Sequence, residues 1–563
     1  MGLSAVSEPI YDYVIVGGGS AGCVLAARLS EDPAVQVLLI EAGKRDRSPL
    51  IRAPGGLLPI MLSGAHAWPY VSTPQKQLND RVLYLPRGKV MGGGSSINGM
   101  VYDRGFASDY DRIAAAGNPG WSYAEVLPYF RRAETFHRPN DPYHGDTGPI
   151  QVSRPGAKHP FARAFIEAGR QAGYAGNDDT NGAEREGFGP VDVTIGRGVR
   201  SSASRAYVDP ARRRANLHFA LRAHASRVLL TDGRATGVEY LQKGRTHQVR
   251  ARREVLLCGG AINSPQLLML SGIGPPDQLL AHGIAVRHEL PGVGQGLQDH
   301  LAVVVKYRSL APISLFKYFK PWHGAAALVQ YLVARGGPLG DPGMEACAFV
   351  KSDPALAEPD IKLLLVMALY ANNGRELSPH HGFAAHTNVI RPASRGSVRL
   401  ASANPLDAPL IDQNYLAREE DWRIARAAVR IARVVFAQKA FDALRGEELE
   451  PGPAISTDAQ VDAFIRSKAE ADYHSVGTCR MGRDELAVVD AELRVHGVAG
   501  LRVVDASVIP HMIGGNTNMP VIMVAEKAAA MIRGAASPAT SSTSVQAGLL
   551  AIAARCSPPG SRP

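Results

Sequence analysis

The sequence predicts an α/β fold, and three stretches of the chain carry this prediction. The first is an apolar strand (13–16), a glycine-rich turn, a helix with apolar residues at helical spacing, and a second strand (37–40). The second, "LLCGGAINSPQLLMLSGIG" (256–274), repeats strand, glycine pair and helix, with Ser264 expected as N-cap and Pro265 as first helical residue. The third, residues 390–416, alternates polar and apolar residues between turn formers, which is typical of sheet.

The first turn carries the spacing G-x-G-x-x-G at Gly17, Gly19 and Gly22. Between a strand and a helix, the first glycine permits a tight turn, the second lets the backbone approach a pyrophosphate, and the third lets the helix pack on the strand. Glu41, which follows Gly22 by 19 residues, can accept hydrogen bonds from a ribose diol and would repel a 2′-phosphate. The pattern predicts a dinucleotide site that disfavours NADP, and it leaves FAD and NAD both open.

A second glycine-rich loop, "RGKVMGGGSSINGMVYDRG", occupies residues 87–105. Its three consecutive glycines and two serines give a flexible backbone that can lie against a flat or anionic ligand, with Asn98 as a polar contact. A plain surface loop is the alternative interpretation of this stretch.

Composition narrows the classes of protein. A chain of 563 residues is too long for one ordinary core, so we expect two domains or one elaborated domain. The net charge of +10 is scattered and aromatic residues are only 6%, which argues against nucleic-acid binding. Five widely spaced cysteines predict neither a disulfide framework nor a metal site. No spanning helix or secretion signal is recognisable, so we expect a cytoplasmic protein.

Two C-terminal segments complete a pattern that resembles a known family. They are "YHSVGTCRMG" (473–482) and the strand, loop and helix of "LRVVDASVIPHMIGGNTNMPVIMVAEKAAAMI" (501–532). With the three glycine-rich stretches, they make the chain similar to the glucose-methanol-choline (GMC) oxidoreductases, whose two sequence motifs are recognisable at 88–105 and 260–274. The resemblance spans about residues 11–536. It implies a Rossmann-like FAD-binding domain and a second, substrate-binding domain on a mostly antiparallel sheet.

The resemblance also divides the chain. We expect a discontinuous FAD-binding domain from residues 11–150, 201–305 and 486–536, and a substrate-binding domain from 151–200 and 306–485. Residues 537–563, rich in Ser, Pro, Ala and Gly, are expected to be a disordered tail.

The cofactor contacts that the resemblance implies are glycines, short polar residues and two acids. Gly17, Gly19, Gly22 and Glu41 would hold the ADP half, Gly92, Gly93, Ser95 and Asn98 would lie beside the isoalloxazine ring, Asp505 would meet the pyrophosphate or ribityl region, and Asn516 would continue past the flavin. Some family members attach FAD through a histidine just before the loop asparagine. Ile97 stands there in this chain, so we expect non-covalent FAD.

For catalysis, the resemblance implies an active-site pair at His474 and Asn518, with His511 as a rival for the second position. Hydride leaves an alcohol carbon easily only when the hydroxyl proton is removed, and an imidazole accepts a proton near neutral pH. His474 would therefore act as the base, Asn518 would hold the oxygen, and hydride would pass to flavin N5.

The expected function is FAD-dependent oxidation of a primary alcohol to an aldehyde, with electrons passed to a quinone or another carrier. A choline dehydrogenase and an oxygen-using alcohol oxidase are close alternatives, and an FAD-containing hydroxynitrile lyase is the alternative of another class. Residues 314–337 concentrate aromatics beside lysines. They are interpreted as a lid over the pocket, as a peripheral contact with the inner membrane face, or as a partly buried helix.

Overall fold

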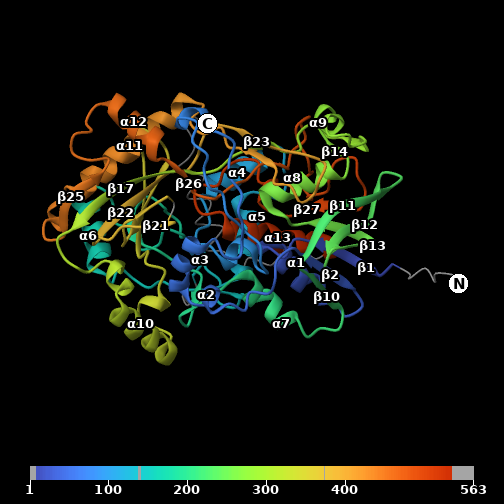
Figure 1. Cartoon of the computed structure of the whole chain (residues 1–563), viewed down its shortest axis with the longest axis horizontal. Helices are drawn as coiled ribbons and strands as arrows, with labels where there is room; N and C mark the ends of the chain where they lie inside the picture. The colour runs from blue at the N-terminus through green and yellow to red at the C-terminus, as the bar shows by residue number, and fades with distance from the viewer. Residues whose placement is uncertain (1–7, 137–140, 373, 535–563) are drawn as a thin grey trace, which may run out of the picture.

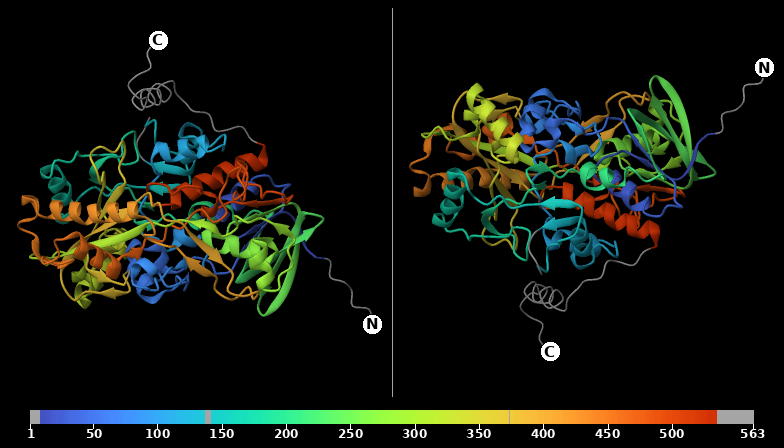
Figure 2. Two further views of the ribbon diagram at one scale, coloured as in Figure 1. Left: turned by 90° about the horizontal axis from the view of Figure 1, so that it is seen from above. Right: turned by 90° about the horizontal axis from the view of Figure 1, so that it is seen from below.

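Two seven-stranded sheets organise the protein, one toward each end of the molecule (Figure 1). The computed structural model describes residues 8–136, 141–372 and 374–534, and the predicted tail (537–563) lies outside these ranges. Figure 2 shows the same arrangement from above and below. The predicted α/β class with a second, antiparallel sheet is confirmed.

The first sheet is parallel at its centre and carries an antiparallel extension. Its order is β10 (Leu217–Leu221), β2 (Val37–Glu41), β1 (Ile10–Val16), β13 (Arg245–Leu257), β12 (Arg234–Gln242) and β11 (Ala223–Thr231), with β27 (Leu501–Val503) beside β13. β1 pairs in parallel with β2 and with β13. These strands are buried and nearly continuous in apolar residues, as expected for parallel strands covered on both faces.

The second sheet is antiparallel at every pairing. Its order is β25 (Arg445–Glu450), β17 (Leu301–Ser309), β22 (Gly382–Val389), β19 (Ile361–Val366), β18 (Ala346–Val350) and β7 (Gly187–Pro190), with β26 (Glu470–Ala471) beside β17. The predicted domain boundary at residue 305 falls inside β17, which belongs wholly to this sheet. The division into domains stays a prediction.

Helices cover both sheets. They are α1 (Ser20–Leu29), α2 (Pro49–Arg52), α3 (Leu57–Ser63), α4 (Ala107–Ala115), α5 (Tyr123–Ala133), α6 (Pro160–Gln171), α7 (Asp209–Ala211), α8 (Gly260–Leu270), α9 (Pro276–Ala281), α10 (Pro321–Ala334), α11 (Glu419–Phe436), α12 (Asp458–Lys468) and α13 (Asn518–Arg533). α13 packs against α1 and α5, and the apolar face of α11 packs against β22. No helix in the described ranges is long and apolar enough to cross a membrane.

α8 differs from its predicted start. The helix begins at Gly260, so Ser264 and Pro265 lie inside it rather than at its N-terminus. Pro265 has no N–H to donate to the carbonyl of Ala261, and the Thr478 hydroxyl donates to that carbonyl instead, at 2.6 Å. Ser264 keeps a capping function, because its Oγ accepts the N–H of Gly259 at 3.0 Å. The sequence pattern identified the helix and misplaced its first residue because a tertiary contact stabilises the proline.

Candidate active site

The first glycine loop is shaped by close backbone contacts. Gly17 has φ of +103°, a conformation that favours glycine, and a Cβ there would lie 2.5 Å from the carbonyl oxygen of Cys258. A Cβ on Gly22 would lie 1.9 Å from the carbonyl oxygen of Gly17. Gly19 is different, because its nearest neighbour would be 3.7 Å from an added Cβ. The protein itself requires Gly17 and Gly22, whereas only a ligand would require the bare backbone of Gly19.

The second glycine loop packs on the first. The N–H of Gly92 donates to the carbonyl of Gly18 at 2.7 Å, and a Cβ on Gly93 would lie 2.7 Å from Cα of Gly19. Ser95 is buried and donates to the carbonyl of Gly92 at 2.6 Å. Gly93 and Asn98 belong to the cavity wall described below, while Gly92 and Ser95 shape the loop behind that wall.

Two predicted acids lie at the ends of neighbouring strands. Glu41 ends β2 and accepts the N–H of Gly18 at 2.8 Å and of Gly43 at 2.6 Å. Asp505 follows β27 and accepts the N–H of Gly260 at 2.8 Å, at the start of α8. Burial raises the pKa of both carboxyl groups. Each oxygen of Glu41 accepts one of these bonds and can accept another from a ligand hydroxyl. Both oxygens of Asp505 already accept two bonds each, from Gly260, Ser264 and Ser507.

A cavity of about 540 Å³ joins these loops to His474. One end is lined by Gly17, Gly19 and Glu41, and the other by Asn98, His474 and Asn516. The first end offers bare backbone and a carboxylate for a ribose, and the second offers polar groups for a reacting centre. These residues fit an extended dinucleotide such as FAD.

The backbone around His474 is held from two sides. His474 follows β26, and Tyr473 before it has φ of +65°, which is uncommon for a tyrosine. The N–H of His474 donates to Asp299 at 2.6 Å, and the Arg87 guanidinium donates to the carbonyl of Tyr473 and, at 2.8 Å, to Ser475. The imidazole therefore enters the cavity from a fixed backbone.

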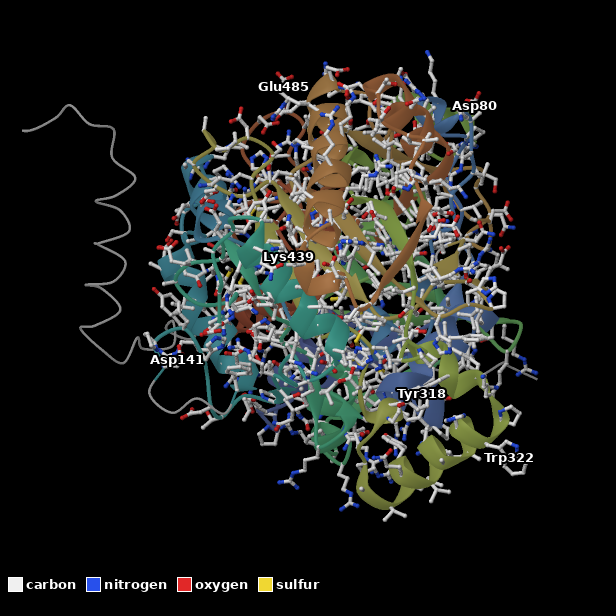
Figure 3. The ribbon with its side chains drawn as sticks, turned by 90° about the vertical axis from the view of Figure 1, so that its left-hand side faces the viewer. Asp80, Asp141, Tyr318, Trp322, Lys439 and Glu485 are labelled. Atoms are coloured by element: carbon white, nitrogen blue, oxygen red, sulfur yellow. The ribbon has the colours of Figure 1, made fainter. Side chains whose placement is uncertain are left out.

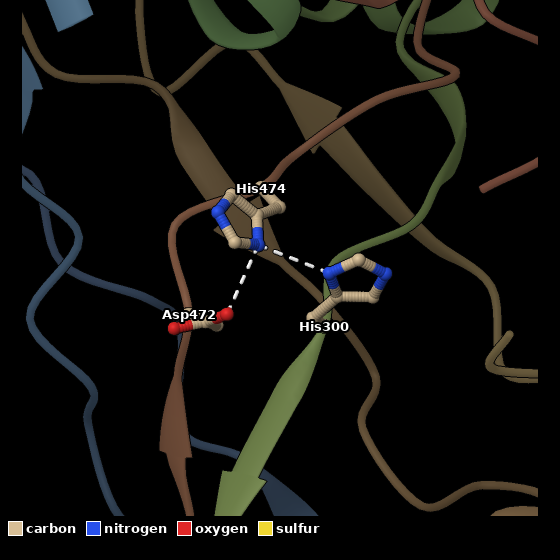
Figure 4. A group of neighbouring side chains, drawn as sticks. All are labelled: His300, Asp472 and His474. Atoms are coloured by element: carbon tan, nitrogen blue, oxygen red, sulfur yellow. Dashed lines mark hydrogen bonds and ion pairs between the residues drawn. The ribbon is translucent and has the colours of Figure 1, made fainter. Parts of the chain in front are cut away.

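Contacts at Nδ1 of His474 determine the tautomer of its ring (Figure 4). Nδ1 lies 3.0 Å from an oxygen of Asp472 and 3.0 Å from Nδ1 of His300. Nε2 of His300 lies 3.0 Å from the carbonyl of Ile390, to which it must donate, so Nδ1 of His300 is an acceptor. The proton between these groups consequently sits on Nδ1 of His474.

Charges around the ring agree with this assignment. Burial, with the neighbouring ring of His474 when that ring is protonated, lowers the pKa of His300 to about 3, so that His300 is neutral. Burial would raise the pKa of Asp472, but His474, through its positive charge when protonated and its hydrogen bond, lowers it well below its usual range. An ionised carboxylate therefore faces Nδ1–H of His474.

Asn516 is the asparagine that meets His474. Its Nδ2 lies 2.9 Å from Nε2 of His474, and its Oδ1 accepts from Lys362 at 2.5 Å. Because the lysine takes the amide oxygen, the amide N–H₂ must face His474, whose Nε2 accepts. Lys362 is buried in β19 and also donates to Asp103 at 2.8 Å, while Arg185 pairs with the same carboxylate. This chain of buried groups orients Asn516.

Asn518, the predicted second catalytic residue, also lines the cavity, but the structure gives its side chain a different partner. It is the first residue of α13, and its Oδ1 accepts from the hydroxyl of Ser20 at 2.8 Å, at the start of α1. The rival His511 is exposed and is not part of the cavity wall. The geometry thus pairs His474 with Asn516, two residues before the expected position.

Sequence reasoning also missed Asp472, Lys362 and the part played by His300. Asp472 lies two residues before His474, directly before the quoted segment "YHSVGTCRMG", and this proximity was the only signal for it. Lys362 had none, because it lies more than a hundred residues from Asn516 in the chain and reaches it through the register of β19.

Comparisons with known proteins identify the family of the chain. The family models described as GMC oxidoreductase match residues 11–302 and 392–525. An oxygen-dependent choline dehydrogenase of Rhizobium etli is 46% identical over 93% of this chain and 95% of the relative. The mitochondrial choline dehydrogenase of Homo sapiens is 46% identical over 94% of this chain and 90% of the relative.

Solved structures show the same fold. Pyridoxine 4-oxidase from Mesorbium loti superposes with a TM-score of 0.85 at 33% identity, covering 93% of this chain and 100% of that one. A formate oxidase superposes with a TM-score of 0.88 at 28% identity, covering 94% and 99%.

The glycine geometry predicts two different consequences of adding one methyl group. Gly17→Ala should lower the melting temperature even of the cofactor-free protein, because the backbone at φ +103° and the Cys258 carbonyl cannot accept a Cβ. Gly19→Ala should leave the melting temperature of the cofactor-free protein nearly unchanged and lower the FAD content. Thermal unfolding of stripped protein and flavin absorbance per chain measure the two effects. Full FAD content in Gly19→Ala would contradict the assignment of this loop.

Proposed function

The chain belongs to the GMC oxidoreductase family and is an FAD-dependent oxidoreductase of alcohols, and we propose that His474 is its base and Asn516 its oxygen-binding partner. The observation that carries this proposal is the tautomer of His474: Nδ1–H faces Asp472, and Nε2 is an acceptor, which here receives the amide N–H of Asn516. A primary alcohol would be oxidised to an aldehyde there.

The proton is the part of the reaction that this chain's residues handle. An alcohol that displaces the 2.9 Å contact between Asn516 and Nε2 of His474 donates its hydroxyl proton to the ring, and its oxygen accepts from the amide N–H of Asn516. The imidazolium that forms is stabilised by the carboxylate of Asp472, which already faces Nδ1–H at 3.0 Å. FAD, when bound, supplies the acceptor for the hydride of the substrate carbon.

Lys362 and His300 assist without touching the substrate. Lys362 holds the oxygen of Asn516 and thereby keeps the amide donor directed at the alcohol. His300 accepts from Nδ1 of His474 and, being neutral, adds no charge that would oppose formation of the imidazolium. Both are therefore positioning residues in this proposal.

Choline is the first substrate candidate, because the relatives with 46% identity are named choline dehydrogenases. Tyr370 and Tyr473 line the cavity, and aromatic rings attract quaternary ammonium groups. A neutral alcohol is the second candidate. It is favoured by the apolar wall near His474, which includes Leu364 and Val366, and by Asp472 being already paired with His474. For the electron acceptor we propose a quinone or a comparable carrier.

Substitutions at the two asparagines separate the competing assignments. His474→Ala should retain FAD and lower turnover by about 10² to 10⁴. Asn516→Ala should lower turnover by about 10², because a donor to the reacting oxygen is lost. Asn518→Ala, the matched control, should change turnover per bound flavin only a few-fold. Rapid-mixing reduction of the flavin measures each rate, and a larger loss in Asn518→Ala than in Asn516→Ala would contradict the proposal.

We also propose that FAD is held without a covalent bond. Ile97 lies in the cavity wall at the position where some family members carry the attaching histidine, and an aliphatic side chain cannot form that bond. Acid precipitation should therefore leave the flavin in the supernatant. Yellow colour that stays in the washed precipitate would contradict this proposal.

An anaerobic titration with alcohols tests the reaction and its substrate together. Choline should bleach the flavin, and its neutral isostere, with carbon in place of nitrogen, should do so at least about tenfold less efficiently if the tyrosines bind the cation. Faster reduction by the isostere would replace choline with a neutral alcohol. No bleaching by any primary alcohol would contradict the proposed reaction, and the rate of reoxidation in air separates an oxidase from a dehydrogenase.

A further inference from the structure

α10 is an apolar helix that the rest of the described protein leaves mostly uncovered. Of its fourteen residues only Ala327 and Tyr331 are buried, one helical turn apart on the side facing the protein. The other faces carry large apolar side chains: Trp322 is 86% exposed, Val333 83%, Val329 61%, Leu332 61% and Leu328 49%. A helix of this composition is normally buried or in contact with lipid.

The helix stands out from the body of the protein. Figure 1 shows α10 at the lower edge, beyond the second sheet, and Figure 3 shows Trp322 at the outer margin of the molecule. Its neighbour Phe319 is 44% exposed. Soluble proteins rarely expose contiguous apolar patches, and such patches mark sites of association.

The charged residues of the segment that carries this patch have one sign. Residues 310–340 contain Lys317, Lys320, His323 and Arg335 and no aspartate or glutamate. Lys320 and Arg335 are exposed at the two ends of α10. Basic residues that flank an apolar helical face are the pattern of helices that lie in the interface of an anionic bilayer.

We propose that α10 is a membrane-docking helix, with Trp322, Leu328, Val329, Leu332 and Val333 entering the headgroup region and the flanking basic residues contacting anionic lipids. The helix is too short to span a bilayer, so the contact is peripheral. Of the interpretations of residues 314–337 given by the sequence, the exposure of α10 favours this one over a partly buried helix.

Docking would bring the cavity close to the lipid. Leu315, just before α10, and Pro342, Gly343 and Met344, just after it, line the cavity that contains His474. The membrane would therefore lie against one wall of the reaction chamber. An apolar substrate or carrier dissolved in the bilayer would have a short path to the site.

Vesicle flotation of the full-length holoenzyme tests the proposal. The protein should float with vesicles of phosphatidylcholine and phosphatidylglycerol and much less with phosphatidylcholine alone, and added salt should release it. Leu332→Gln with Val333→Gln should lower binding about tenfold or more, since two apolar groups no longer enter the bilayer. Lys317→Gln with Lys320→Gln should weaken binding only to the anionic vesicles.

The matched control removes apolar side chains of the same kinds elsewhere. Leu280 and Val82 are 63% and 54% exposed, so Leu280→Gln with Val82→Gln should leave binding unchanged. Oxidation of the alcohol with a soluble dye as acceptor should be the same in all these variants, because none of the six substituted residues lines the cavity. That assay reports the proposed reaction separately from the docking.

Three results would overturn the proposal. They are absence of flotation with both vesicle types, equal loss of binding in the control variant, and full binding by the Leu332→Gln, Val333→Gln variant. Sedimentation of the same samples tests whether a second copy of the chain covers the patch. If the protein does not bind vesicles and forms a dimer that is lost in the Leu332→Gln, Val333→Gln variant, the patch is a self-association surface instead.

Discussion

The proton on Nδ1 of His474 is the interaction around which the active site is arranged. Asp472 at the end of β26, His300 at the start of β17 and the carbonyl of Ile390 after β22 together determine where it lies. All three come from the second sheet. The cofactor loops come from the first sheet, so the base is presented by one sheet to a ligand held by the other. The cavity is lined by residues from segments that both sheets hold in place.

A buried cluster of charged residues orients Asn516, the second residue of the proposed catalytic pair. Asp103 lies between Arg185 and Lys362, and although burial raises its pKa, the two cations lower it well below the usual range. A buried cation without a partner is costly, so Lys362 needs Asp103, and the carboxylate needs both cations. Lys362 is held in place by Asp103 and also donates to Oδ1 of Asn516. The charge pairing therefore fixes the orientation of the Asn516 amide. The same cluster therefore contributes to folding and to the site.

The sequence predicted the parts of the fold and site that depend on local pattern. The glycine spacing identified the first loop because Gly17 and Gly22 meet backbone atoms that any strand–turn–helix unit of this kind would bring close. His474 was found because its segment resembles a family motif. Asn518 was preferred to His511 because its segment leads directly into the final helix, and only the path of the backbone before that helix shows that the amide of Asn516 reaches His474. Lys362 was invisible for a related reason: strand register, which no local pattern reveals, brings it to the site.

The apolar segment at 314–337 illustrates a different limit of sequence reasoning. A short helix rich in Leu, Val and Ala has the same composition whether it lies in a core, under another subunit or at a membrane, because burial depends on what the rest of the chain places over it. In this protein Tyr331 and Ala327 are the buried residues of α10, and the helix packs mainly against the short turns 315–319 and 338–340 beside it. The apolar surface that α10 leaves exposed is larger than the surface that these two residues bury. The basic residues at its ends favour an anionic partner. Because the flanking residues Leu315 and Met344 belong to the cavity wall, the partner of this helix also determines what environment the reaction chamber meets.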